Sequence, residues 1–281
     1  MDTIQSIFII SRKRDTERLQ RVKQQLDTLL TPTSFKIPVI HFEAIEPDFS
    51  DPILAAFRDR FKLGTWSWVR KASPERQESY QRGAIGCMLS HIHVCTAALN
   101  NGLQRIMVLE DDVVFSRDFV GEVNDAIYFL DNSREIGGRW DLLYLESTEP
   151  ISLRTSTAHE VVYRDAEKKP RLLQTFGNLN TAAMILNKTA MTEITTKVAE
   201  CLMEIDVYLG LNYSPTHRVY MLPEPLGAKQ ASFTSTIDDT RKGFDWPPLY
   251  DPSTMVARKR YARNVRNTGR SSLIPNANFA N

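Results

Sequence analysis

The chain has 281 residues, of which 42 % are hydrophobic and 25 % are charged, and its formal net charge is +1. This composition is typical of a globular protein that buries a sizeable core. The near-neutral charge gives no indication of a nucleic-acid partner, so any charged partner must be recognised by a local patch.

Nothing in the sequence indicates export or a transmembrane span. The N-terminal MDTIQSIFII is too short and too acidic for a signal peptide, and no apolar run approaches the roughly 18 residues of a spanning helix. The three cysteines are an odd number without framework spacing, which favours a reducing compartment. We therefore expect a cytoplasmic protein, soluble or peripheral to a membrane.

The first predicted elements form a β–α–β unit. The apolar run Ser6–Ile10 predicts a buried strand, and hydrophobic residues at helical spacing follow Asp15, a candidate N-cap, as far as Pro32. Val39–Phe42 predicts the next strand. This order favours a parallel sheet with a ligand crevice at the carboxyl ends of its strands.

The rest of the chain continues the alternation of helices and strands. Residues 51–82 predict a short helix and then a polar, aromatic loop over 62–80, and residues 147–170 predict irregular structure. The predicted helices are Gly83–Gly102, Phe119–Leu130 and Lys188–Met203; the predicted strands are Arg105–Leu109, Trp140–Leu145, Ala182–Leu186 and Arg218–Leu222. We expect a single Rossmann-like α/β domain, with a mainly parallel central sheet flanked by helices.

Three adjacent carboxylates interrupt the apolar stretch RIMVLEDDVVF. Glu110 and Asp112 would share a face if the strand continued through them, whereas Asp111 would point elsewhere. Such a pair suits Mn²⁺ or Mg²⁺, which binds one or two carboxylates together with phosphate oxygens. The alternative is a solvated acidic turn, but the flanking hydrophobic runs contain none of the usual turn residues.

The segment GAIGCMLSH (Gly83–His91) precedes VLEDDVVF by about twenty residues. The two together resemble the signature of family 25 glycosyltransferases, the bacterial lipopolysaccharide or lipooligosaccharide sugar transferases related to collagen galactosyltransferases. Further segments resemble that family in order: IISRKRDTER, HFEAI, GNLNTAAMILNKTAM, IDVYLG and VYMLPEPL. The resemblance spans Ile7 to Ile237.

The resemblance implies a GT-A-type fold, a UDP-sugar donor (most often UDP-galactose), a divalent cation and inversion at the anomeric carbon. It implies a glycosyltransferase domain over residues 1–237 and a basic C-terminal extension over 238–281. The acceptor would be a glycan of a bacterial surface glycolipid, which would place the enzyme in the cytoplasm, peripheral to the inner face of the membrane.

The resemblance also suggests roles for individual residues. Asp112 would ligate the metal directly, and Glu110 would reach the metal, a metal-bound water or the ribose. Asp206 would be the catalytic base, with an ordinary helix-capping role as the alternative. The other candidate donor-binding residues are Ser11, Arg14, Glu43, Ser90, His91, Asp111, Lys229, Gln230 and Ser232.

Two further patterns have competing interpretations. Cys87, His91 and Cys95 share one helix face, which could suggest zinc, but nothing nearby in sequence completes a tetrahedron, and core cysteines are the favoured interpretation. His217 is a weaker candidate metal ligand. The basic segment 256–270 could bind an anionic membrane surface or be a solvated tail.

The sequence therefore predicts a metal-dependent, inverting hexosyltransferase. Two other classes stay open. A metal-dependent phosphohydrolase would also use clustered carboxylates but would need ligands for a second metal. An inactive sugar-nucleotide-binding module could share the same fold.

Overall fold

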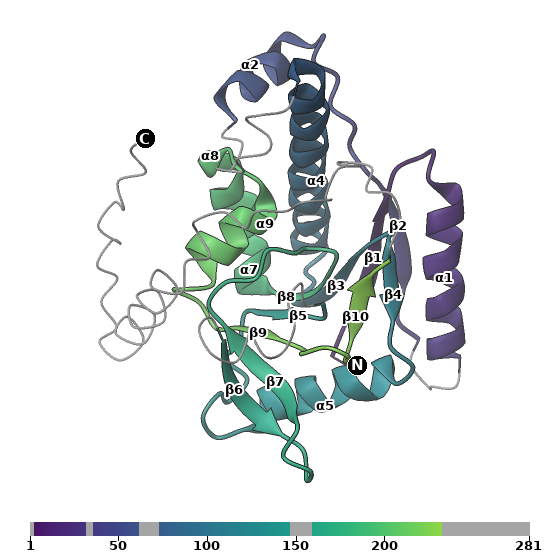
Figure 1. Cartoon of the computed structure of the whole chain (residues 1–281), viewed down its shortest axis with the longest axis vertical. Helices are drawn as coiled ribbons and strands as arrows, with labels where there is room; N and C mark the ends of the chain where they lie inside the picture. The colour runs from purple at the N-terminus through teal and green to yellow at the C-terminus, as the bar shows by residue number, and fades with distance from the viewer. Residues whose placement is uncertain (1–2, 32–35, 62–72, 147–158, 232–281) are drawn as a thin grey trace.

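The chain folds around one eight-stranded sheet (Figure 1). The computed structural model describes residues 3–31, 36–61, 73–146 and 159–231. In spatial order the strands of the sheet are β2 (Val39–Glu43), β1 (Ser6–Ser11), β3 (Arg105–Glu110), β8 (Ala183–Asn187), β5 (Leu142–Tyr144), β9 (Val219–Met221), β7 (Pro170–Thr175) and β6 (His159–Arg164).

The sheet is mixed rather than mainly parallel. β2 and β3 both pair in parallel with β1, as the β–α–β pattern predicts, and β5 pairs in parallel with β9. However, β8 is antiparallel to both β3 and β5, and β7 is antiparallel to β6 and β9. A buried strand is apolar on both faces whichever way it runs, so the hydrophobic pattern carried no information about its direction.

Alternation along the strands divides the core into two layers. In β1, Phe8 and Ile10 face one hydrophobic cluster, whereas Ile7 and Ile9 face the other. The second cluster is covered by α1 (Thr16–Leu30) and α5 (Phe119–Asn132). The first is covered by α2 (Pro52–Arg60), α4 (Pro74–Asn100), α7 (Lys188–Glu193), η1 (Ile194–Val198), α8 (Ala199–Cys201), α9 (Ile205–Tyr208) and η2 (Leu209–Tyr213). Figure 1 shows α4 and α1 on either side of the strands.

The structure corrects three predictions about individual elements. Residues 73–80, expected in the loop, are instead the N-cap Ser73 and the first turns of α4. The segment 147–170, expected to be irregular, contains β6 and the first residue of β7, and the two strands pair with register shifts around Tyr163 at the edge of the sheet. Because β6 is mostly half-exposed and bulged, it lacks the clean alternation by which strands are recognised. The predicted helix Lys188–Met203 is interrupted by the π-helical turn η1.

A short two-stranded sheet joins the end of the described chain to the strand that follows β3. β10 (Ala228–Gln230), a strand that the sequence analysis did not predict, is antiparallel to β4 (Val113–Phe115). Just before β10, Gly227 has φ +77°, and an added Cβ would lie 2.2 Å from the carbonyl oxygen of Leu145. Only glycine allows the chain to cross so close to β5 and return to β4.

Parts of the predicted organisation lie outside the described residues. They are residues 62–72 of the predicted loop, residues 147–158, and the whole extension 238–281 with its basic segment. The boundary at 237 therefore stays a prediction. None of the described helices combines the length and apolar composition that crossing a bilayer requires.

Gly86 determines how closely α4 approaches the end of β2. An added Cβ would lie 2.4 Å from the carbonyl oxygen of Ile45, which is backbone and cannot turn away. We predict that Gly86→Ala lowers the free energy of unfolding by about 1–3 kcal/mol, despite alanine's higher helix propensity. Urea unfolding monitored by circular dichroism measures this change.

Gly121 in α5 is the matched control, because an added Cβ there meets the flexible carboxylate of Asp118 rather than backbone. Gly121→Ala should be neutral or stabilising by up to about 1 kcal/mol. Equal effects at the two glycines would contradict the proposed contact between α4 and Ile45.

Candidate active site

The three carboxylates form a turn at the end of the central strand β3. β3 ends at Glu110, and Asp111 and Asp112 form the turn that leads into β4. The prediction that Glu110 and Asp112 share a strand face assumed that the strand continues, and this assumption is wrong. We call Glu110, Asp111 and Asp112 together the carboxylate turn. Each of the three side chains has its own set of partners.

Glu110 points to the α4 side of the sheet. Its carboxylate accepts a 2.9 Å hydrogen bond from the hydroxyl of Thr181, and 26 % of the side chain is exposed. Burial, the largest cause, and then the negative charges of Asp112, Glu146 and Asp111 together raise the pKa of Glu110 to about 8. Asp112 is therefore electrostatically coupled to Glu110 although the two do not share a strand face. A cation at this position would relieve the repulsion.

Asp111 points to the β1–α1 connection. It accepts a 2.6 Å hydrogen bond from the hydroxyl of Ser11 at the end of β1, and the guanidinium of Arg18 in α1 lies 3.6 Å away. Burial raises the pKa of Asp111, whereas the bond from Ser11 opposes the rise. The predicted donor-binding residues Ser11 and Asp111 are thus bound to each other, and Arg18 lies closer to the carboxylate turn than Arg14 does.

Asp112 is bound to the C-terminal strand β10. Its Oδ2 accepts a 2.8 Å hydrogen bond from the side-chain amide of Gln230, and its backbone carbonyl accepts one from the amide of Ala231. Its other carboxylate oxygen, Oδ1, is buried and has no hydrogen-bond partner in the described part of the chain. A buried carboxylate oxygen without a donor is suited to ligating a cation.

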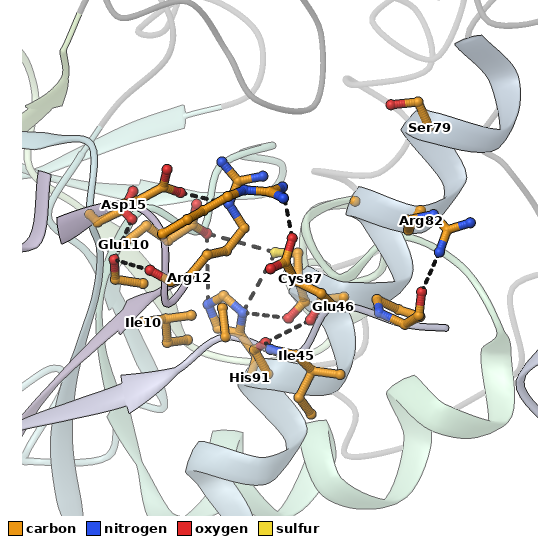
Figure 2. Close-up of a pocket in the computed structure, with 18 residues that line it drawn as sticks. Ile10, Arg12, Asp15, Ile45, Glu46, Ser79, Arg82, Cys87, His91 and Glu110 are labelled. Atoms are coloured by element: carbon orange, nitrogen blue, oxygen red, sulfur yellow. Dashed lines mark hydrogen bonds and ion pairs between the residues drawn. The ribbon is translucent and has the colours of Figure 1, made fainter. Parts of the chain in front are cut away.

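A pocket of about 170 Å³ opens beside this turn (Figure 2). It lies at the carboxyl ends of β1, β2 and β3. From β1 the chain continues into α1 on one face of the sheet, and from β2 it continues toward α4 on the other face. Ligands of open α/β sheets bind at such switch points. Its chemistry-bearing lining includes Ser11, Arg12, Arg14, Asp15, Glu46, Arg82, Cys87, Ser90, His91, Glu110 and Asp111.

Two predicted residues on α4 have internal partners. The hydroxyl of Ser90 accepts a hydrogen bond from the amide of Ile45 and donates one to the carbonyl of Gly86. It thereby fixes the loop after β2 against α4. His91 is fully buried, and its Nδ1 lies 3.0 Å from the carbonyl oxygen of Cys87. Burial lowers the pKa of His91, so the imidazole is neutral near neutral pH.

Of the two predicted residues Arg14 and Glu43, only Arg14 lines the pocket. Arg14 lines the pocket and forms a 2.7 Å ion pair with Glu46. Glu43, the last residue of β2, is exposed and is not among the lining residues. Glu46, three residues after Glu43 and beyond the end of the strand, lines the pocket instead.

At the C-terminal strand, Gln230 contacts the carboxylate turn, whereas Lys229 is exposed and Ser232 lies outside the described residues. The backbone amide of Gln230 also donates to the carboxylate of Glu146, which is 4 % exposed and lies just after β5. Sequence analysis missed Glu146. The signal was present, because an acidic residue directly after the apolar strand WDLLYL repeats the pattern RIMVLE at the end of β3.

The candidate base Asp206 lies in the first turn of α9, whose N-cap is Glu204. Its carboxylate accepts a hydrogen bond from the amide of Val207, and its charge raises the pKa of the Cys87 thiol, after burial and Glu110. The charge of Asp206 thus reaches Cys87, which lies beside Glu110. His217 stacks on Tyr213 and precedes β9. It therefore lies at the end of the strands opposite to the carboxyl end of β3. It does not join the site.

The part of the chain that contains this site has a recognisable family pattern. The family model described as "Glycosyltransferase family 25 (LPS biosynthesis protein)" matches residues 4–209. The chain belongs to glycosyltransferase family 25.

The family 25 relatives are mostly longer proteins. A glycosyltransferase 25 family member of Anopheles gambiae is 31 % identical over 143 residues, which are 50 % of this chain and 22 % of that protein. Procollagen galactosyltransferase 2 of Homo sapiens is 32 % identical over 72 residues, 26 % of this chain and 11 % of that protein. Another human relative, 32 % identical over 72 residues, 26 % of this chain and 12 % of that protein, is named inactive glycosyltransferase 25 family member 3. The aligned part therefore spans about a fifth or less of these relatives.

Solved structures give only distant likenesses. The galactosyltransferase LgtC, in complex with donor and acceptor sugar analogs, has a TM-score of 0.40 and 10 % identity and is covered over 98 % of its chain and 96 % of this one. A mannose-1-phosphate geranyltransferase from Thermus thermophilus has a TM-score of 0.37 and 11 % identity, over 81 % of this chain and 76 % of that one.

The raised pKa of Glu110 predicts a pH-dependent stability. An unfolded glutamate loses its proton near pH 4.3, whereas folded Glu110 keeps it until about pH 8. Between these values the folded state binds more protons than the unfolded state, so the free energy of unfolding falls as the pH rises. Urea unfolding in the presence of a chelator, repeated across this pH range, measures the slope.

Glu110→Gln should flatten that slope, because a neutral amide has no proton to lose. Glu43→Gln, at an exposed position on β2, controls for the loss of one negative charge. The prediction fails if Glu110→Gln and the wild-type chain show the same slope.

Proposed function

We propose that this family 25 member is a divalent-cation-dependent, inverting glycosyltransferase that moves a hexose, galactose in the first instance, from a UDP donor to a glycan of bacterial lipopolysaccharide or lipooligosaccharide. The observation that carries the proposal is the carboxylate turn. It places desolvated, mutually repelling carboxylates, one with a buried oxygen lacking a donor, beside a pocket at the switch point of the sheet.

The chemistry of the carboxylate turn fits a hard cation. Asp112 would ligate Mn²⁺ or Mg²⁺ through Oδ1, and Glu110 would be the second protein ligand. When bound, such an ion neutralises negative charge on the departing diphosphate. The opposite charges of Asp111 and Arg18 would then neutralise each other on the side of the turn that faces the nucleotide.

The pocket residues suit a nucleotide diphosphate. Arg12 and Arg14 line it on the side of the β1–α1 connection, and Arg82 lines it from α4. Guanidinium groups form charge-assisted, bidentate hydrogen bonds with phosphate oxygens. The ion pair between Arg14 and Glu46 is half-exposed, so a diphosphate can exchange with the carboxylate at small cost.

Asp206 is the proposed general base. An inverting transfer requires a group that accepts the proton of the attacking acceptor hydroxyl on the face opposite the leaving diphosphate. Asp206 lies on α9 and its charge reaches Cys87, but it is not among the lining residues of the pocket, which extends to β1 and the segment after β2. The acceptor would therefore enter between α9 and the turn.

The other two classes are supported less well. A two-metal phosphohydrolase needs a second ligand cluster, and the described residues contain one group of three or more potential ligands, made of Cys87, His91 and Glu110. An inactive module would bind the donor without turnover, which the experiments below distinguish. Peripheral binding at the inner face of the membrane through residues 256–270 stays a prediction, because these residues lie outside the described part.

Asp112→Asn should remove donor binding that depends on Mn²⁺. For the wild-type chain, a UDP-sugar at about 100 times its Kd would add about 2.7 kcal/mol of stability, seen as several degrees in Tm. The variant should lose most of this shift, because a neutral amide is a poor ligand for a hard cation. A thermal-shift screen of UDP-sugars and other nucleotide sugars, with and without Mn²⁺, measures it.

Asp125→Asn is the matched control, since Asp125 is 63 % exposed on α5 and is not among the residues that line the pocket. It should respond to each donor as the wild-type chain does. If the wild-type chain and Asp112→Asn respond identically to every donor, the assignment of the cation site is wrong.

Asp206→Asn should separate chemistry from binding. Loss of a general base lowers kcat by about 10²–10⁴-fold, whereas the Kd for the UDP-sugar, measured calorimetrically with Mn²⁺, should stay within about twofold of the wild-type value. Unchanged turnover in the variant would exclude Asp206 as the base. Donor binding without turnover in the wild-type chain, with every acceptor tried, would favour the inactive module.

A further inference from the structure

Three chemically different side chains meet at the α4 side of the carboxylate turn. Cys87 and His91 lie one turn apart on α4, and Glu110 reaches them from β3. The thiol sulfur lies 3.7 Å from His91 Nδ1 and 3.8 Å from Glu110 Oε1, and His91 Nε2 lies 3.9 Å from the same carboxylate oxygen. Figure 2 shows the three side chains pointing toward one another.

The imidazole of His91 directs an unprotonated nitrogen, Nε2, toward Glu110. A backbone carbonyl can only accept a hydrogen bond, so the 3.0 Å contact with the Cys87 carbonyl places the ring proton on Nδ1. Nε2 then carries a lone pair, and this buried atom has no hydrogen-bond partner among the described residues. The groups near the ring are Glu110 Oε1 and the backbone carbonyl of Thr181, and both are acceptors when Glu110 is ionised. With Glu110 ionised, three acceptors face one another in a buried space, an arrangement that a cation would stabilise.

The set of ligands indicates the class of cation. Thiolate and imidazole favour a borderline-soft ion such as Zn²⁺, whereas Mn²⁺ and Mg²⁺ favour oxygen. Zinc bonds of about 2.0–2.3 Å to nitrogen, oxygen and sulfur allow one ion to bridge atoms that all lie within 4.8 Å of one another. The three residues also line the pocket, which leaves a fourth position for water or an anionic ligand.

We propose that Cys87, His91 and Glu110 form a zinc-type site that competes with the hard-cation site for Glu110. Occupancy by Zn²⁺ would withdraw the Glu110 carboxylate from its place beside Asp112 and would inhibit sugar transfer. The binding of the ion stands on these three residues alone. Its inhibitory effect also rests on the proposed function.

Binding is tested on the full chain with Co²⁺ as the spectroscopic probe for Zn²⁺. The wild-type chain should give a thiolate-to-cobalt charge-transfer band that Zn²⁺ abolishes by displacement. Cys87→Ser should lose the band and bind Zn²⁺ at least about tenfold more weakly, and His91→Gln should keep the band but bind more weakly. Cys201→Ser, at a half-buried cysteine outside the group, is the matched control and should match the wild-type chain.

A second measurement needs no substitution. Zn²⁺ should slow alkylation of Cys87 in the wild-type chain, read by peptide mass, and should leave the alkylation rate of Cys201 unchanged. Absence of the thiolate band, equal behaviour of Cys87→Ser and Cys201→Ser, or equal protection of the two thiols would each overturn the site.

Inhibition is tested separately by following UDP release with Mn²⁺ while Zn²⁺ is titrated. Zn²⁺ should inhibit competitively with Mn²⁺, and Cys87→Ser should require at least about tenfold more Zn²⁺ relative to its own uninhibited rate. Zinc binding without inhibition of an active chain would overturn the shared use of Glu110. If no donor is turned over at all, the proposed function fails, while the cobalt spectrum still decides whether the zinc site exists.

Discussion

Repulsion among the carboxylates of Glu110, Asp111 and Asp112 is the constraint around which this end of the molecule is organised. Desolvation at the end of a buried strand makes the negative charges of Glu110 and Asp111 costly, and the charge of Asp112 raises that cost. The compensation comes from segments far apart in sequence, with Ser11 and Arg18 from the first β–α connection and Gln230 from the last described strand. The interactions that hold the turn together therefore also bring the first and last described segments of the chain to one place.

The same turn separates two kinds of cation chemistry. Oδ1 of Asp112, which is buried and has no donor among the described residues, offers a hard ligand, whereas Cys87 and His91 offer a sulfur and a nitrogen on the other side of Glu110. Glu110 is common to both proposed sets, so the two ions would compete for its carboxylate. Close packing makes this sharing possible, since Gly86 lets α4 approach the β2 end and Ser90 bonds to Ile45 there.

Local patterns predicted much of the fold but not its connections. The strand β1, the helix α1 and the strand β3 begin within one residue of their predicted starts, because strong periodicity and clear boundaries coincide there. The hairpin β6–β7 escaped prediction because its outer strand is half-exposed and bulged. β10 escaped because three residues cannot show a period, and β4, its partner, lies more than a hundred residues earlier.

By itself the sequence determined the β–α–β opening, the family signature and the acidic residues at the end of a buried strand, because these depend on neighbouring residues. Which carboxylate faces which partner was decided only in three dimensions, since the chain turns after Glu110 and ends the alternation on which the prediction relied. Tertiary packing also decided that Glu110 meets Cys87 and His91, that Glu146 joins the turn and that Glu43 stays outside. These contacts join segments whose spacing in sequence bears no relation to their distance in space.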